Sequence, residues 1–188
     1  MEKLIILGTG NAAVTKCYNT CFAIQNDEEY FLVDTGGGNG ILTQLEKAEI
    51  PIPKIHHIFI SHEHTDHILG VVWMIRMVAT AIRKGTYEGN LNIYCHKDLV
   101  DTIVTIAKLT LVKKFFSIIG ERIFLIPVED KETVQILDYD VTFFDIQSEK
   151  AKQYGFTMKL LNGKKSLISN YETGYSCPDI YTLIKLAD

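Results

Sequence analysis

Short apolar runs separated by polar or glycine-rich turns dominate the first third of the chain. Residues 4–7 form an apolar run that ends in Gly8-Thr9-Gly10, which predicts a buried strand followed by a tight turn. Residues 19–25 and 30–34 flank the polar loop 26–29, a pattern typical of a β-hairpin. The glycines of Asp34-Thr35-Gly36-Gly37-Gly38 then end the second strand in a flexible turn.

Strand-like and helix-like segments alternate through the middle of the chain. Residues 40–47 carry Ile41, Leu42 and Leu45 at helical spacing, residues 55–60 read as a strand, and residues 68–84 again have helical periodicity. A strand over 91–95 and a helix from 97 towards 116 follow. Four further strands are predicted over 123–127, 133–136, 141–146 and 156–160. This order predicts a single α/β domain over 1–188, in which helices cover β-sheets.

Composition and charge narrow the class of protein. Its 188 residues, 47% hydrophobic and 22% charged, suit one globular domain with a sizeable core. The net charge of −4 excludes a global basic field for nucleic acid or anionic lipid. The four cysteines, Cys17, Cys21, Cys95 and Cys177, form no CxxC pair, and no N-terminal apolar run is long enough for a signal peptide. We therefore expect reduced thiols in a cytoplasmic protein without a membrane span.

The N-terminal sequence LIILGTGNAA resembles a dinucleotide-binding fingerprint, and Asp34 ends a strand at a suitable distance downstream. That fingerprint requires a helix directly after the glycines, because the helix N-terminus holds the pyrophosphate. Residues 14–20 are β-branched and polar and lack a helical apolar stripe. The favoured interpretation is a tight turn after a strand, and nucleotide binding is the minor alternative.

A cluster of metal-ligand residue types follows the strand over 55–60. The sequence FISHEHTDHILG places His62, His64, Asp66 and His67 within six positions. Imidazole and carboxylate groups suit Zn²⁺, with Mn²⁺ or Fe as alternatives. Two such ions about 3.5–4 Å apart would lower the pKa of a shared water and clamp the oxygens of a phosphoryl or acyl substrate. A solvated polar turn is the alternative, and the density of ligand types in one loop disfavours it.

With these residues the chain resembles the metallo-β-lactamase superfamily, whose signature is His-x-His-x-Asp-His. The match consists of the four loop residues, the strand before them, Gly70 after them, and the upstream turn Asp34-Thr35-Gly36. The opening LGTGNAA and the segment Tyr18-Asn19-Thr20 look most like the ribonuclease Z branch. The resemblance implies an α/β fold of the four-layer αββα sandwich type, with metals at one edge of two packed sheets.

The resemblance also implies roles for individual residues. His62 and His64 would bind one metal ion, and Asp66 and His67 would bind a second. Asp66 would in addition hold or deprotonate the attacking water, which makes it the candidate catalytic residue. Asp34 would fix the tautomer of a histidine through the ring N–H of that histidine.

The second half of the chain departs from the family pattern. The family supplies a third histidine, a bridging aspartate and a last histidine there, whereas all six histidines of this chain lie at or before residue 96. Gln147 occupies the position expected for the third histidine, and its amide oxygen is a far poorer zinc ligand. Glu172 and Asp179 are candidate replacements for the aspartate. From Ser166 the sequence no longer follows the family, as a truncated or divergent second half would explain.

Three other histidines receive structural interpretations. Alternation along a strand should send His56 and His57 to opposite faces, one buried and one exposed. His96 follows Cys95 at a strand end, where an ordinary loop is favoured over a place in the site.

The sequence predicts a metal-dependent hydrolase of phosphodiesters or other small hydrolysable substrates, with one or two zinc ions. The alternative, from a different class, is a catalytically impaired relative that serves as a binding or interaction module. Nucleic acid is a weaker candidate partner, because no long glycine- and proline-rich arm of the ribonuclease Z type lies between Gln147 and Ser169. Sheet edges and apolar faces exposed by an incomplete second half predict a homodimer.

Overall fold

The computed structural model describes residues 2–159, 165–168 and 185–186. The first half of the chain forms a six-stranded sheet in the order β1-β2-β3-β4-β5-β6. Its strands are β1 (Lys3–Gly8), β2 (Cys21–Asn26), β3 (Glu29–Val33), β4 (Ile55–Phe59), β5 (Leu91–His96) and β6 (Ile123–Val128). β1, β2 and β3 pair antiparallel, and β3 to β6 are parallel. The parallel strands therefore end at one common edge.

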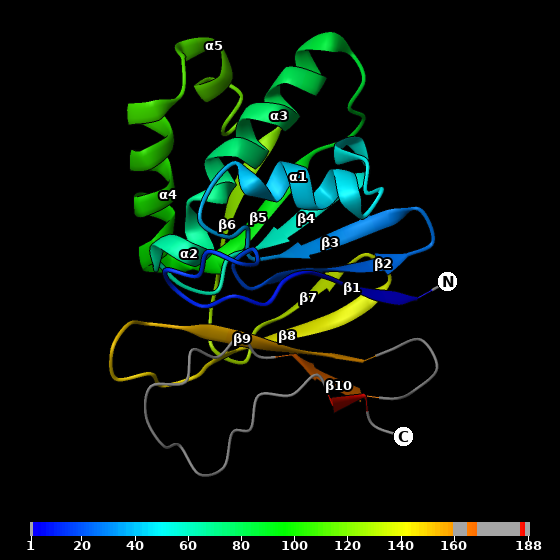
Figure 1. The fold of residues 1–188 in the computed structure, drawn as a ribbon, viewed down its shortest axis with the longest axis vertical. Coiled ribbons are helices and arrows are strands. Elements are labelled where there is room, and N and C mark those ends of the chain that lie inside the picture. The colour runs from blue at the N-terminus through cyan, green and yellow to red at the C-terminus, as the bar shows by residue number, and fades with distance from the viewer. Residues whose placement is uncertain (1, 160–164, 169–184, 187–188) are drawn as a thin grey trace.

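Helices cover one face of this sheet (Figure 1). They are α1 (Gly40–Lys47), α3 (Gly70–Lys84) and α4 (Lys97–Thr110), with the short turns η1 (Ile52–Lys54), α2 (Thr65–Ile68) and α5 (Lys113–Phe116) between or after them. α3 buries an apolar stripe against the sheet that includes Val71, Met74, Ile75 and Val78. This stripe repeats at helical spacing, so burial of one face stabilises the helix.

The segment Thr65–Lys84 is also long and apolar enough to cross a membrane by composition alone. Half of its most apolar window is buried inside the fold. A helix that covers a sheet in the core passes the same test, and the packing of α3 on the sheet accounts for its apolar character.

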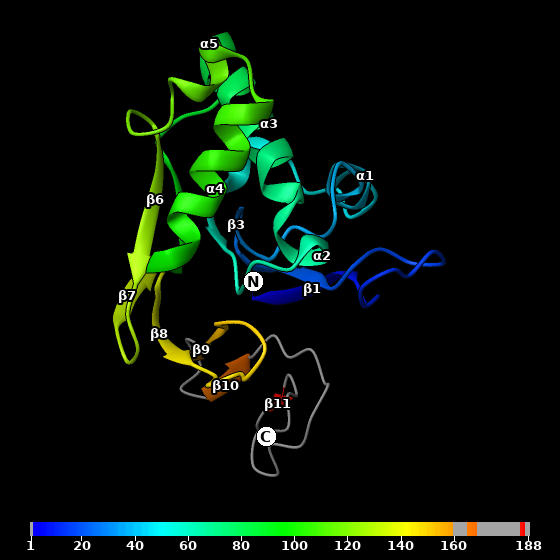
Figure 2. The same ribbon diagram turned by 90° about the vertical axis from the view of Figure 1, so that its left-hand side faces the viewer.

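A second, antiparallel sheet packs on the other face of the first sheet (Figures 1 and 2). Its order is β11-β10-β9-β8-β7, formed by β7 (Thr133–Ile136), β8 (Tyr139–Asp145), β9 (Tyr154–Lys159), β10 (Lys165–Ile168) and β11 (Lys185–Leu186). Aromatic rings fill the space between the sheets: Phe59 and Phe143 have ring centroids 5.1 Å apart, and Phe31 and Phe156 are 5.5 Å apart. Such tilted pairs stabilise sheet packing beyond their buried area.

The fold class expected from the sequence is confirmed, and the described part contains the helix, sheet and sheet layers of the sandwich. No described residue forms a helix on the outer face of the second sheet. The chain between β1 and β2 forms turns rather than the helix that a dinucleotide fingerprint requires. The helix predicted over 68–84 is observed as α3 from Gly70, preceded by the separate short helix α2 over Thr65–Ile68. The two are separate at this point, where the Gly70 N–H donates to the carbonyl of Gly36 at 2.9 Å.

Candidate metal centre

The histidine cluster lies in the loop after β4, at the edge where the parallel strands end. The loop turns into α2, a single helical turn that contains Asp66 and His67 and is preceded by His64. His62, Asp66 and His67 are buried, and His64 is half-buried. The carboxyl edge of parallel strands is where α/β sheets commonly bind ligands. The structure therefore brings all four predicted residues to a position suited to a site.

The four side chains approach one another in two pairs. Nε2 of His62 lies 3.0 Å from Nδ1 of His64. Nε2 of His67 lies 3.5 Å from Oδ2 of Asp66. Two ligand atoms on a tetrahedral zinc ion with bonds of about 2.0–2.1 Å are themselves about 3.3 Å apart. Each pair therefore has the spacing that two ligands of one ion require, and the donor set fits a metal.

Asp34 organises the cluster from the end of β3. Its side chain is fully buried, and its backbone has φ of 53°, a left-handed conformation that Asp and Asn tolerate better than most residues. One carboxylate oxygen accepts a hydrogen bond from the backbone N–H of Ser61 at 2.8 Å. The other accepts from the Ser61 hydroxyl at 2.8 Å and from Nδ1 of His67 at 2.6 Å.

These contacts decide which ring nitrogen of each histidine carries the hydrogen. His67 donates its Nδ1–H to Asp34, so the lone pair of its Nε2 faces Asp66. The Ser61 hydroxyl donates to Asp34, so its oxygen accepts from Nδ1 of His62, 2.8 Å away. The lone pair of His62 Nε2 then faces His64. Both imidazoles are thus oriented for metal binding by their second nitrogen.

Asp34, His62 and His67 also form a possible three-residue metal site, because one ligand atom of each lies within 4.8 Å of the other two. The hydrogen bonds favour a different role for Asp34. A carboxylate has about four lone-pair positions, and three hydrogen bonds already occupy most of them. Asp34 is therefore better suited to hold the histidines than to ligate the ion.

Burial also sets the charge of His62. Loss of water around the imidazolium lowers the pKa of His62 to about 4, and the neighbouring His67 and His64 lower it further while Asp34 acts in the opposite direction. His62 is therefore neutral at pH 7. A neutral imidazole is the form that binds a metal, so no proton has to be removed first.

The segment between β1 and β2 contacts the cluster through backbone groups. The N–H of Ala12 donates to Oδ2 of Asp66 at 2.8 Å. The side-chain amide of Asn19 donates to the carbonyl of Ala12 at 2.9 Å, and its Oδ1 accepts from the N–H of Gly37 at 3.2 Å. Asn19 thus joins the turn after β3 to the segment that orients Asp66.

The loop between β8 and β9 contributes a residue that the sequence did not indicate. Gln147, the position expected for a third histidine, is exposed with φ of 58°, and its N–H donates to Oδ1 of Asp145 at 2.7 Å. Gln153 is buried instead, and Nε2 of its side-chain amide lies 3.1 Å from Nδ1 of His62. No motif marks Gln153, because its contact depends on how the sheets pack. Ser61 was also missed, although its position directly before His62 was an available signal.

His96 ends β5 beside the metal loop, and it is buried rather than part of an ordinary loop. Neither ring nitrogen has a hydrogen-bond partner among the described residues, and Nε2 lies 3.8 Å from Oε2 of Glu63. Burial lowers the pKa of His96, so its imidazole is neutral near pH 7. Glu172 and Asp179, the candidate replacements for the bridging aspartate, lie outside the described residues.

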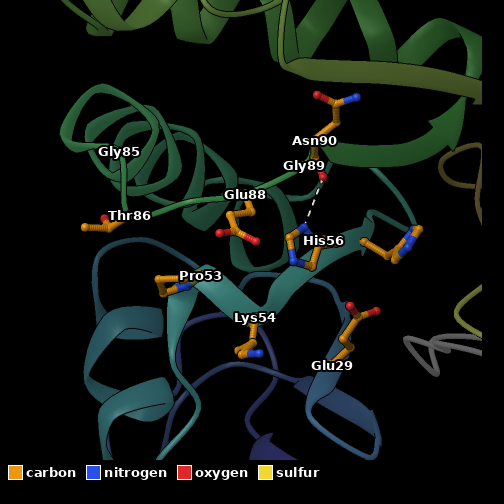
Figure 3. A pocket seen from close by; sticks show the side chains of 10 residues that line it. Glu29, Pro53, Lys54, His56, Gly85, Thr86, Glu88, Gly89 and Asn90 are labelled. Atoms are coloured by element: carbon orange, nitrogen blue, oxygen red, sulfur yellow. Dashed lines mark hydrogen bonds between the residues drawn. The ribbon is translucent and has the colours of Figure 1, made fainter.

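A polar pocket of about 660 Å³ lies at the opposite edge of the first sheet, where β3, β4 and β5 begin (Figure 3). Nδ1 of His56 lies 3.3 Å from the carbonyl of Asn90 there, and Glu29, Lys54 and Glu88 give the pocket mixed charge. His56 contacts the ring of Tyr87, and His57 stacks on Tyr94. Both histidines are half-buried, so the prediction that one would be buried and the other exposed was wrong. The pocket is remote from the histidine loop, where we place the chemistry.

Comparison with known proteins gives a family and a set of relatives. The family model described as Anti-Pycsar protein Apyc1 matches residues 2–176. Ribonuclease Z of Methanococcus aeolicus is 31% identical over 189 residues, which cover 96% of this chain and 54% of the relative. The chain therefore spans about half the length of that curated relative.

Solved structures show the same fold at low sequence identity. The short form of human tRNase Z has a TM-score of 0.70 and 21% identity over 94% of this chain and 71% of that chain. The metallo-β-lactamase fold protein YhfI from Bacillus subtilis has a TM-score of 0.69 and 16% identity over 90% of this chain and 63% of that chain. The fold, the HxHxDH loop and the family match together show that this chain belongs to the Anti-Pycsar protein Apyc1 family, within the metallo-β-lactamase superfamily and near ribonuclease Z.

Proposed function

We propose that this chain is a metal-dependent hydrolase that cleaves phosphodiester bonds. The observation that carries the proposal is the convergence of four side chains into two pairs, His62 with His64 at 3.0 Å and Asp66 with His67 at 3.5 Å. The phosphodiester class is supported by the similarity to proteins named ribonuclease Z and tRNase Z.

Each pair of the cluster would hold one metal ion, with zinc as the ion that this donor set suits. Bound ions would polarise the phosphoryl group and lower the pKa of a water molecule. Asp34 keeps the hydrogen of His67 on Nδ1 and, through Ser61, the hydrogen of His62 on Nδ1. Asp66 is oriented by the Ala12 N–H, 2.8 Å from its Oδ2, and its carboxylate would accept the proton of the attacking water.

Metal content and hydrolysis test the proposal together. Protein purified without chelator or histidine tag should contain close to two metal ions per chain by elemental analysis and should hydrolyse bis(4-nitrophenyl) phosphate. Asp66→Asn should lower turnover at least about 100-fold, since the amide cannot accept a proton. His56→Asn, outside the cluster, should not. One metal or fewer without hydrolysis would refute the proposal.

A binding module without catalysis is the second candidate function. The observation that favours it is Gln147, which is exposed at the position where the resemblance places a metal-binding histidine. This candidate predicts at most one metal ion and no turnover in the same experiment. It would be supported by retained folding in the absence of metal.

The proposal also includes the size of the substrate and the cellular compartment of the protein. A small phosphodiester is favoured over nucleic acid as the substrate, because the net charge of the chain is −4. The segment between Gln147 and Ser169 is also too short to contain the long glycine- and proline-rich arm of the ribonuclease Z type. Faster hydrolysis of RNA than of a small phosphodiester would reverse this preference. Cys17, Cys21 and Cys95 are free thiols, which suits the reducing cytoplasm.

A further inference from the structure

Gln153, the residue directly before β9, reaches the metal cluster from the loop between β8 and β9. Its residue surface is 4% exposed, and Nε2 of its side-chain amide lies 3.1 Å from Nδ1 of His62. The backbone is anchored on both sides of this contact: the carbonyl of Gln153 accepts from the N–H of Ile146 at 2.9 Å, and the N–H of Tyr154 donates to the carbonyl of Ser61 at 3.1 Å. Packing of the two sheets therefore holds this side chain against His62.

Gln153 contacts the Nδ1 side of the His62 imidazole, and the proposed metal position is on the Nε2 side. Nδ1 and Nε2 are distinct positions of the ring, and a contact at one nitrogen decides what the other can bind. Gln153 touches Nδ1, whereas Nε2 faces His64 at 3.0 Å. Gln153 is thus placed to control His62 and not to ligate an ion shared by His62 and His64.

The position of the imidazole hydrogen of His62 determines whether the oxygen or the nitrogen of the Gln153 amide should face Nδ1. The oxygen of Ser61 lies 2.8 Å from the same Nδ1, and the hydroxyl hydrogen of Ser61 is given to Asp34. Nδ1 of His62 therefore carries a hydrogen, which two acceptors can share but no N–H donor can approach. The oxygen and nitrogen ends of a carboxamide are nearly equal in size, so exchanging the two ends of the Gln153 amide places its oxygen where Nε2 now lies.

We propose that Gln153 is a positioning residue whose side-chain oxygen accepts the Nδ1–H of His62 and so keeps the Nε2 lone pair available for a metal ion. If Gln153 donated instead, the hydrogen would sit on Nε2 and block metal binding. The inference rests on the proposed metal site. It also makes metal affinity depend on the packing of the second sheet on the first, because His62 follows β4 of the first sheet and Gln153 precedes β9 of the second.

The tautomer of His62 gives the direct test, on metal-free protein at pH 7. Long-range ¹H–¹⁵N correlation spectra of histidine-labelled protein should show the hydrogen on Nδ1 of His62 in the natural chain and in Gln153→Glu, which retains an oxygen acceptor. Gln153→Met, similar in shape but without an oxygen acceptor, leaves the Ser61 oxygen as the remaining acceptor, so it should show a larger fraction of hydrogen on Nε2 than the natural chain. Hydrogen on Nε2 in the natural chain would overturn the proposal.

Zinc affinity gives the second readout, measured by competition with a chromogenic chelator. Gln153→Met should weaken zinc binding about 10- to 100-fold, the usual effect of losing a partner behind a metal-binding histidine, and Gln153→Glu should restore it. Gln135→Met, at an exposed glutamine of the second sheet, is the matched control and should bind zinc normally. Unchanged affinity in Gln153→Met would overturn the proposal. Neither readout requires hydrolysis, so a chain that binds zinc without turnover would refute the proposed function alone.

Discussion

At the scale of single residues, Asp34 orients side chains of the HxHxDH motif although it is distant from the motif in sequence. Asp34 lies 27 positions before Ser61 and 33 before His67, yet it accepts hydrogen bonds from both. Because the site is buried, each of these charge-assisted hydrogen bonds is stronger than it would be in water. The geometry of the cluster is therefore set by a residue outside the HxHxDH sequence.

Asp34→Asn should weaken zinc binding about 10- to 100-fold with little change in backbone conformation. Asn tolerates the φ of 53° and keeps one oxygen for the Ser61 N–H, but its NH₂ group cannot accept the Nδ1–H of His67. Chelator competition measures the affinity, and circular dichroism checks the fold. Asp138→Asn, whose carboxylate binds Asn26 away from the site, is the control. Equal zinc affinity in Asp34→Asn would contradict the role given to Asp34.

Protonation of His57 should make the metal-free protein less stable in mild acid. Burial, with His56 nearby, lowers the pKa of His57 to about 4, whereas a histidine in the unfolded chain titrates near 6.5. Between these values the unfolded chain binds a proton that the folded chain excludes. The free energy of unfolding should therefore fall as pH decreases from about 6.5 to about 4, and His57 should contribute no change above 6.5.

Urea unfolding at pH 7 and pH 5 measures this effect. His57→Gln should reduce the loss of stability between the two pH values. Part of the loss should remain, because His62 also has a pKa of about 4 in the folded chain. Equal losses in the natural chain and in His57→Gln would show that His57 does not titrate as described.

At the scale of elements, the junction of α2 and α3 ties the metal loop to the turn after β3. The N–H of Thr35 donates to the carbonyl of His67 at 3.0 Å, and the N–H of Gly70 donates to the carbonyl of Gly36 at 2.9 Å. A Cβ at Gly70 would lie 1.9 Å from the carbonyl oxygen of Thr35. Only glycine permits this approach of two backbones, so the start of α3 positions Asp34 as well as covering the sheet.

Gly70→Ala should destabilise the protein by about 1–3 kcal/mol, the usual range for an overpacked core position, and should weaken zinc binding as well. The added methyl group must push Thr35, and Asp34 with it, away from the helix. Gly85→Asn provides a control at a glycine with φ of 72° and open space, where Asn is tolerated. Urea unfolding gives the stabilities. A Gly70→Ala protein as stable as Gly85→Asn would contradict the close contact.

At the scale of the whole molecule, the candidate site lies at the edge of the first sheet and also contacts the loop before β9 of the second sheet. Asp34 and the histidine loop follow β3 and β4 of the first sheet, and Gln153 directly precedes β9 of the second. The same packing joins Phe59 to Phe143 in the space between the sheets. Metal binding to the folded chain should therefore stabilise the sandwich as a whole.

Zinc at about 100 times its dissociation constant should raise the melting temperature by about 5–10 °C, which corresponds to about 2.7 kcal/mol of binding energy in a chain of this size. Differential scanning fluorimetry with zinc, and with a chelator, measures the shift. Magnesium prefers oxygen ligands and should give a smaller shift. An absent zinc shift would argue against the metal site.

Exposed apolar side chains at the end of α4 support a prediction of self-association. Leu109 is 80% exposed and Val112 is 53% exposed. Apolar side chains in such positions often lie in protein interfaces. Light scattering should give a mass near twice the chain mass of 21.3 kDa. A mass of one chain would count against the homodimer.

The order of elements and the HxHxDH loop could be predicted from the sequence by itself. Strand alternation, helical spacing and ligand spacing are properties of a few neighbouring residues, so they remain readable without a structure. Helix α1 was predicted at its observed bounds for this reason. The ends of β8 and β9 were less accurate, because pairing across the sheet extends β8 back to Tyr139 and β9 back to Tyr154.

Only the tertiary structure decided which other polar residues meet the histidines. The sequence directed attention to Gln147, and folding places Gln153 against His62, 91 positions away. Likewise, His96 is buried beside Glu63 although its local sequence favours an ordinary loop. Such contacts depend on how β8, β9 and the first sheet pack in three dimensions. A hydrogen bond between two distant segments produces no spacing pattern in the sequence of either segment. The HxHxDH motif could therefore be predicted from the sequence, whereas the residues that hydrogen-bond to it could not.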